Sequence, residues 1–106
     1  MGIIHAFRSQ WNFRFHIYTS CVVIFSAILL QLTVLEWCII LLCLGSVIAT
    51  ELINTAIEIN IDLTSPEFNK KAGHAKDVAA GAVLITSLIA AIIGLIIFIP
   101  KIIHIN

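Results

Sequence analysis

The chain has 106 residues, of which 60% are hydrophobic and only 11% carry a charged side chain. A soluble domain of this length could not bury so much apolar surface in its core, which excludes the soluble globular class. The formal net charge is zero, so no basic footprint for nucleic acid is present, and we expect one integral membrane domain over residues 1–106.

The first predicted element is an amphipathic helix over about 3–16. Apolar residues at 3, 4, 7, 11 and 15 follow the three-or-four spacing of one helix face, and Arg8 and Arg14 fall between them. Aromatic residues opposite basic residues are typical of a helix that lies in the membrane interface. This segment either anchors the protein or contributes to a site, and both interpretations stay open.

Three long apolar runs follow, which predicts membrane spans over about 18–32, 35–62 and 78–99. The first is shorter and the second longer than the roughly 20 residues that a bilayer requires. The predicted fold class is therefore an all-α membrane protein, with three transmembrane helices after an interfacial helix. In the last connection, Ser65, Pro66 and Glu67 offer a cap, a first-turn proline and a first-turn acid, which predicts that the third helix begins there.

The distribution of basic residues predicts the orientation. Five of them precede the first span or lie between the second and third, whereas Lys101 alone follows the third: Arg8, Arg14, Lys70, Lys71 and Lys76. Positive residues favour the cytoplasmic side. We expect a multi-pass protein of the bacterial inner membrane with its N-terminus in the cytoplasm.

The second span contains carboxylates where a membrane helix normally has none. At roughly 100° per residue, Glu58 and Asp62 each point within about 20° of Glu51, and Asn54 and Thr55 flank the same stripe. Such a polar ridge must face protein, water or a bound ion, because lipid would leave it unsatisfied. The ridge could join helices, carry protons in a transporter, or form a catalytic site.

The residue types on and beside the ridge suit phosphoryl transfer. Carboxylate and amide oxygens are ligands for Mg²⁺, which often binds together with substrate phosphates. Lys76 follows at the mouth of the third span and can attract phosphate oxygens, and Asp77 stands beside it. Metal, phosphate clamp and base are the parts that this reaction needs, although the sequence has no Walker loop.

The same residues carry a resemblance to a known family. The stretch ELINTAIE at 51–58, Asp62, and AKDVAAGAVL at 75–84 closely resemble the signature of the bacterial diacylglycerol kinase/undecaprenol kinase family. The match extends to NFRFH at 12–16 and EW at 36–37, so it covers nearly the whole chain. The resemblance implies a small homotrimeric membrane kinase with three spans, a surface helix and sites shared between subunits.

On the lipid side, the resemblance assigns Glu51 as the catalytic base that takes the proton from a lipid hydroxyl. It implies that Glu51, Asn54 and Arg14 contact the lipid substrate.

On the nucleotide side, the resemblance implies that ATP is the donor and Mg²⁺ the cofactor. Glu58 would coordinate the metal and contact the nucleotide. Lys76, Asp77 and Asp62 would also bind ATP. Gln10 occupies the position of a family glutamate that shares the metal, and its amide brings an oxygen ligand without a charge.

The predicted function is ATP-dependent phosphorylation of a lipid alcohol of the bilayer, at the cytoplasmic face. The NFRFH stretch and the AAG at 79–81 look more like the undecaprenol branch than the diacylglycerol branch, so undecaprenol is the favoured acceptor. The alternative is a small proton-coupled transporter that uses Glu51 as the carrier. Replacing Lys76 separates the two, because only a kinase needs that lysine for phosphate handling.

Overall fold

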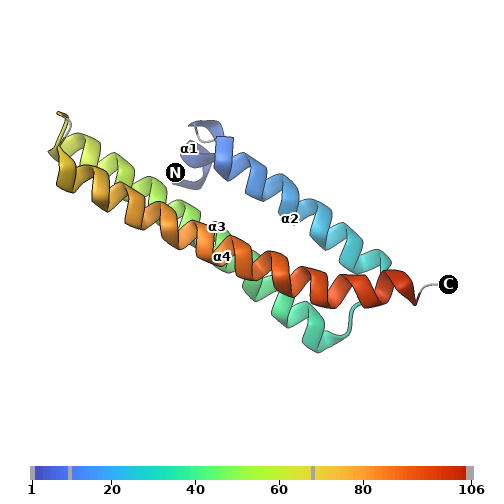
Figure 1. Ribbon diagram of the computed structural model, residues 1–106. Helices are drawn as coiled ribbons and strands as arrows, with labels where there is room; N and C mark the ends of the chain where they lie inside the picture. The colour runs from blue at the N-terminus through green and yellow to red at the C-terminus, as the bar shows by residue number, and fades with distance from the viewer. Residues whose placement is uncertain (1, 10, 68, 105–106) are drawn as a thin grey trace.

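The computed structural model describes residues 2–9, 11–67 and 69–104, and the regular elements in that part of the chain are helices. They are α1 (Gly2–Ser9), α2 (Trp11–Leu29), α3 (Val34–Thr64) and α4 (Lys70–Ile103). Figure 1 shows α3 and α4 side by side, with α2 along them and the short α1 at one end. The longest dimension is 58 Å, enough to cross a bilayer of roughly 40–45 Å. The predicted all-α membrane architecture is confirmed.

The helices α2, α3 and α4 are each long and apolar enough to cross a membrane. The segment 3–16, expected as one surface helix, is divided: α1 ends at Ser9, and residues 11–16 form the first turns of α2. The reason is length. Because α2 already ends at Leu29, it needs the preceding aromatic residues to approach the roughly 20 residues of a span.

A tight turn connects α2 to α3. Gln31 has a φ of 54°, a left-handed conformation that is uncommon for a residue other than glycine and that helps to reverse the chain here. Thr33 then caps α3: its hydroxyl accepts a bond from the Glu36 N–H at 3.2 Å, and the Glu36 carboxylate accepts one from the Thr33 N–H at 2.9 Å. This reciprocal capping box fixes where α3 begins.

The connection between α3 and α4 differs from the prediction. Helix α4 begins at Lys70, and its N-cap is Asn69, whose side chain accepts a bond from the Ala72 N–H at 2.8 Å. Ser65 instead ends α3, because its N–H still donates to the Ile61 carbonyl at 2.7 Å. Pro66 disfavours a helical conformation in the residue before it, so it stops α3 rather than starting α4.

Polar contacts at three levels join α3 to α4. Their pairs are Glu36 with Lys101 at 2.9 Å, Thr50 with Thr86 at 3.0 Å, and Asp62 with Lys76 at 2.6 Å. Near the Glu36 end, Ala27, Leu32 and Ile40 form a buried apolar cluster that joins α2 to α3. Helices α2 and α4 both pack on α3, whereas their backbones stay apart in the described part of the chain.

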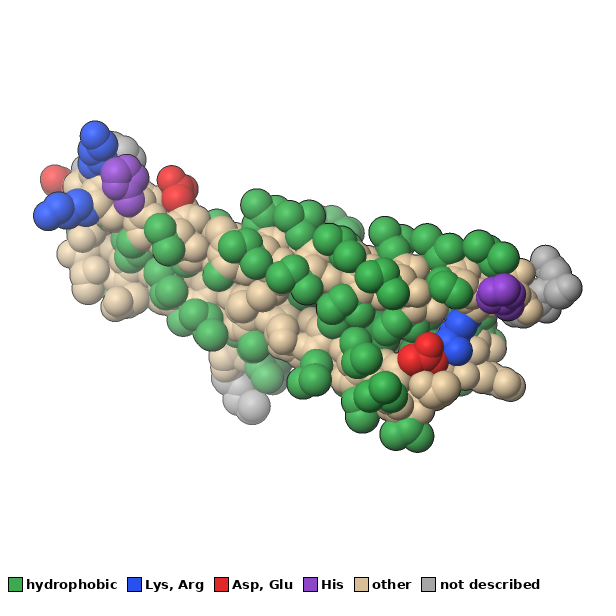
Figure 2. All heavy atoms as spheres, turned by 60° about the horizontal axis from the view of Figure 1, so that its bottom comes forward, with side chains coloured by type: hydrophobic (Ala, Val, Ile, Leu, Met, Phe, Trp, Pro, Cys, Tyr) green, Lys and Arg blue, Asp and Glu red, His purple; other side chains and the backbone are tan. Residues whose placement is uncertain are grey.

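The outer surface is apolar between two charged ends. Figure 2 shows acidic and basic side chains gathered at both ends of the molecule, with a hydrophobic band between them. Large apolar side chains stay exposed in this band, among them Phe25, Leu42 and Ile96, which are 63%, 71% and 66% exposed. Lipid chains or further protein chains are the surroundings that such a surface requires.

Candidate active site

The polar ridge of α3 runs from the interior of the helix bundle to its surface. Glu51 and Thr55 are buried, with 4% and 8% of their surface exposed, Asn54 and Glu58 are half-buried, and Asp62 is exposed. The deep end of the ridge is therefore turned toward protein, as its composition predicted, and not toward lipid.

The ridge holds acceptor oxygens that nothing in the described part of the chain satisfies. Asn54 donates from its amide nitrogen to Glu58 Oε1 at 3.2 Å. Asn54 Oδ1 and Glu51 Oε2 are both buried, and neither has a hydrogen-bond partner among the described residues. A buried polar atom without a partner is destabilising by about 1–3 kcal/mol, so these oxygens are placed as ligand-binding atoms would be.

Lys76 comes to the ridge from the start of α4. Its ammonium lies 2.6 Å from Asp62 Oδ1, and it is near enough to Glu58 for their charges to interact. Asp77, the neighbour expected to assist Lys76, is exposed. The carboxylate that holds the lysine in this structure belongs to Asp62, one element away.

The start of α2 supplies the remaining predicted residues. The Arg14 guanidinium lies over the Trp11 ring at 5.5 Å from its centroid, and Arg14 Nε is buried without a partner among the described residues. Gln10, the predicted second metal ligand, lies outside the described residues. Phe13 fixes this segment, because its side chain is 1% exposed.

Sequence reasoning noticed His16 only as part of a motif. In the structure its side chain lines the same groove as Val47 and Ser87, so α2 brings it toward the ridge of α3. The NFRFH motif carried the signal, but no spacing rule relates a residue of α2 to one of α3.

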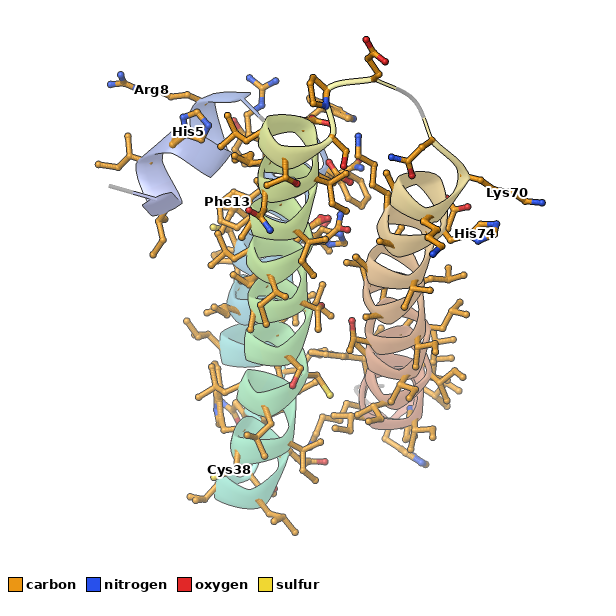
Figure 3. The ribbon with its side chains drawn as sticks, turned by 90° about the vertical axis from the view of Figure 1, so that its left-hand side faces the viewer. His5, Arg8, Phe13, Cys38, Lys70 and His74 are labelled. Carbon is orange, nitrogen blue, oxygen red and sulfur yellow. The ribbon has the colours of Figure 1, made fainter. Side chains whose placement is uncertain are left out.

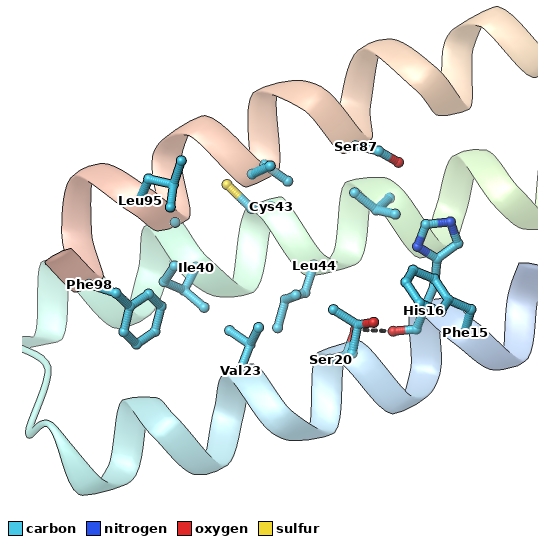
Figure 4. A pocket seen from close by; sticks show the side chains of 15 residues that line it. Phe15, His16, Ser20, Val23, Ile40, Cys43, Leu44, Ser87, Leu95 and Phe98 are labelled. Carbon is cyan, nitrogen blue, oxygen red and sulfur yellow. Dashed lines mark hydrogen bonds between the residues drawn. The ribbon is translucent and has the colours of Figure 1, made fainter.

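A groove of about 440 Å³ lies between α2, α3 and α4 (Figure 4). Most of its lining is apolar, including Ile40, Leu95 and Phe98 at one end. His16, Ser20 and Ser87 make the opposite end polar. Val47 also lines the groove, and Glu51 lies one turn beyond it on the same face of α3. The groove can therefore hold a hydrocarbon chain with its polar end near Glu51.

The residues present fit a magnesium ion that is bound together with a nucleotide. In the described part of the chain, no three His, Cys, Asp or Glu side chains form a metal cage. Mg²⁺ commonly takes only one or two protein carboxylates and completes its shell with phosphates and water. The Glu58 carboxylate and the unpartnered Asn54 Oδ1 are oxygen ligands of that kind.

Comparisons with known proteins identify the family of this chain. The family model described as prokaryotic diacylglycerol kinase matches residues 1–98. The chain is similar to the undecaprenol kinase of Bacillus subtilis, with 44% identity over 94% of this chain and 81% of the relative. It is also similar to the diacylglycerol kinases of Synechocystis, at 40% identity over 93% of this chain and 57% of the relative, and of Haemophilus influenzae, at 29% over 87% and 78%.

These matches extend over nearly all of the helices described above, including the ridge of α3 and the lysine of α4. They favour the kinase over the transporter that the ridge alone left open. The protein is a membrane lipid kinase, and the chain belongs to the prokaryotic diacylglycerol kinase family.

Proposed function

We propose that this protein transfers the γ-phosphoryl group of ATP to the hydroxyl of a membrane lipid alcohol. The observation that carries the proposal is the position of Glu51 beside the polar end of an apolar groove. Glu51 is buried, and one of its carboxylate oxygens has no partner among the described residues. If the ridge served only to join helices, the Glu51 carboxylate would have a hydrogen-bond partner on a neighbouring helix. A lipid-alcohol site needs it unpaired, because its partner is the substrate.

The groove supplies the lipid side of the site. A hydrocarbon chain lies along Ile40 and Leu95, and its hydroxyl reaches the His16 end next to Glu51. Asn54, one turn beyond Glu51, and Arg14 are the further contacts for the polar part of the lipid. Arg14 Nε is buried and has no partner among the residues that the structure describes. The apolar lining supports an oily alcohol as the acceptor, in preference to a sugar or a peptide.

The chemical step follows from the unpartnered oxygen of Glu51. The carboxylate accepts the proton of the lipid hydroxyl while the hydroxyl oxygen forms a bond to the γ-phosphorus of ATP. The bond between that phosphorus and the β–γ bridging oxygen breaks, and ADP leaves. A base in this position is typical of kinases, which work mainly by positioning and charge stabilisation.

The nucleotide side is formed by the surface end of the ridge. Lys76, held by Asp62, donates to phosphate oxygens, and Asp77 and Asp62 complete the contacts with ATP. Glu58 and Asn54 would hold Mg²⁺, with Gln10 as the further ligand that the family pattern implies. When bound, the ion neutralises phosphate charge and aligns the transferred group.

The proposed location is the cytoplasmic face of the bacterial inner membrane. Arg8 and Lys70 lie at the same end of the molecule in Figure 3, and Lys76 is in the first turns of α4 at that end. Basic residues favour the cytoplasmic side, where ATP is available. The N-terminus is then cytoplasmic as well.

The favoured acceptor is undecaprenol. The support is similarity: the undecaprenol kinase relative is 44% identical, and the diacylglycerol kinase relatives are 40% and 29% identical. A homotrimer with shared sites is also part of the proposal. The large apolar side chains that one chain leaves exposed support it, since neighbouring subunits would cover some of them.

The test uses purified protein in mixed micelles with γ-labelled ATP and Mg²⁺. Undecaprenol, diacylglycerol and no lipid are compared, and the labelled lipid is separated by thin-layer chromatography. We expect label in undecaprenol at a higher rate than in diacylglycerol, and loss of labelling when Mg²⁺ is chelated. Label in neither lipid refutes the function, and faster labelling of diacylglycerol refutes the choice of acceptor.

A further inference from the structure

Ser87 differs from four other hydroxyl residues of the membrane helices. Ser20, Thr50, Thr64 and Thr86 each donate to the carbonyl four residues earlier, at 2.7 to 3.1 Å. This local bond is the usual way to satisfy a hydroxyl in a membrane helix. Ser87 Oγ is buried and has no partner in the described part of the chain. Its side chain lines the polar end of the groove, where Figure 4 labels it.

The register of α3 and α4 places Ser87 level with Glu51. Thr50 and Thr86 are in contact at 3.0 Å, which fixes their common height along the antiparallel helices. One residue onward, Glu51 and Ser87 move apart along the axis by only roughly 3 Å in total. In an antiparallel pair this step of roughly 100° turns both side chains toward the same side. That side is the groove, because Ser87 and Val47 both line it.

The third side of this polar end comes from α2. His16 lines the groove with Ser87 and with Val47, which lies one turn before Glu51 on α3. The nearby Ser20 hydroxyl is already engaged, because it donates to the His16 carbonyl at 2.7 Å. Ser87 Oγ is thus a buried groove hydroxyl, without a partner among the described residues, that is placed to bind something other than its own helix.

We propose that Ser87 binds the hydroxyl group of the lipid acceptor and orients its oxygen for phosphoryl transfer. This inference rests on the proposed lipid-kinase function and adds a residue of α4 to its acceptor site. Ser87 donates its hydroxyl hydrogen to a lone pair of the acceptor oxygen, and Glu51 accepts the proton of that same oxygen. Two contacts of opposite polarity leave the oxygen one lone pair directed at the phosphorus.

The test compares wild type, Ser87→Ala and Ser87→Cys, with Ser26→Ala as the matched control because Ser26 does not line the groove. Steady-state rates are measured with undecaprenol and with ATP varied separately. We expect Ser87→Ala to raise the KM for the lipid about fivefold, the loss of one hydrogen bond, and to leave the KM for ATP unchanged. Ser87→Cys, a weaker donor, should fall between the two, and Ser26→Ala should match wild type.

Inhibition by two unreactive probes separates hydrogen bonding from packing. A long-chain methyl ether retains an oxygen acceptor, whereas the alkane of the same length has none. Inhibition by the ether should weaken about fivefold in Ser87→Ala, and inhibition by the alkane should not change. Equal weakening for both probes, or an unchanged lipid KM in an active enzyme, overturns the role of Ser87 alone. A wild-type enzyme that labels no lipid alcohol overturns the underlying function instead.

Discussion

Replacing Glu51 by glutamine should separate activity from stability. The side chain is 4% exposed and Oε2 has no partner among the described residues, so the folded protein keeps a poorly compensated carboxylate. Removing the charge should recover up to the roughly 2.5–3.5 kcal/mol that a charged side chain costs at the centre of a membrane helix. The new amide hydrogens lack partners and should offset about 1–3 kcal/mol of that gain. We expect the stability to change by roughly −0.5 to +2.5 kcal/mol, which is neutral to stabilising.

Activity should change in the opposite direction. A glutamine cannot accept the hydroxyl proton, so the rate of phosphoryl transfer should fall by roughly 100-fold to 10,000-fold, the usual contribution of a general base. The measurements are labelled-phosphate transfer to undecaprenol and thermal unfolding in detergent. Glu36→Gln is the matched control on the same helix. It should lose the Lys101 ion pair and about 0.5–1 kcal/mol of stability while activity stays unchanged.

A Glu51→Gln variant that keeps more than about a tenth of the wild-type rate contradicts a base that contributes at least roughly 100-fold. A large loss of stability would contradict the burial argument instead, since it would mean that the carboxylate has a strong partner that holds the helices together. The two measurements therefore test the chemistry and the structure independently.

Three further predictions concern the other parts of the site. Glu58→Gln should raise the Mg²⁺ concentration needed for half-maximal activity by at least roughly tenfold, as measured by magnesium titration. Roughly tenfold is the typical effect of losing an outer-shell partner, and a direct ligand should matter at least as much. Asp62→Asn should raise the KM for ATP and not for lipid, because Lys76 loses its partner at 2.6 Å; unfolding should shift by less than about 1 kcal/mol, since the pair is partly exposed. An unchanged KM for ATP would separate Asp62 from nucleotide binding. Gly94→Leu should fill the groove and raise the KM for lipid, because a Cβ there meets nothing within 4 Å; equal loss of ATP affinity would point to misfolding.

The sequence predicts the three long helices of the fold, but it does not predict where α4 begins. Apolar runs too long for a soluble core predict the three long helices. The predicted start of α4 was wrong because Ser65 and Asn69 are both good N-cap residues. Choosing between them requires knowing that the Ser65 N–H still donates to the Ile61 carbonyl. When two candidate N-caps are equally good, the point at which the preceding helix ends determines which of them is used.

The site follows from the sequence only along one helix. Periodicity places Glu51, Asn54 and Glu58 on one ridge, because a single helix has a fixed geometry. Contacts between helices depend on how α3 and α4 approach each other. The pairing of Lys76 with Asp62, and the level shared by Glu51 and Ser87, therefore become visible only in the structure.

Helix α3 contacts α4 and α2 in different ways. Two ion pairs and the threonine contact between them fix the register of α3 against α4 at three points along the hairpin. Helix α2 meets α3 through the Ala27–Ile40 cluster near the turn, and apolar contacts of this kind are non-directional and tolerate sliding. The groove between α2, α3 and α4 is therefore bounded on one side by the helix that is attached to α3 through apolar contacts.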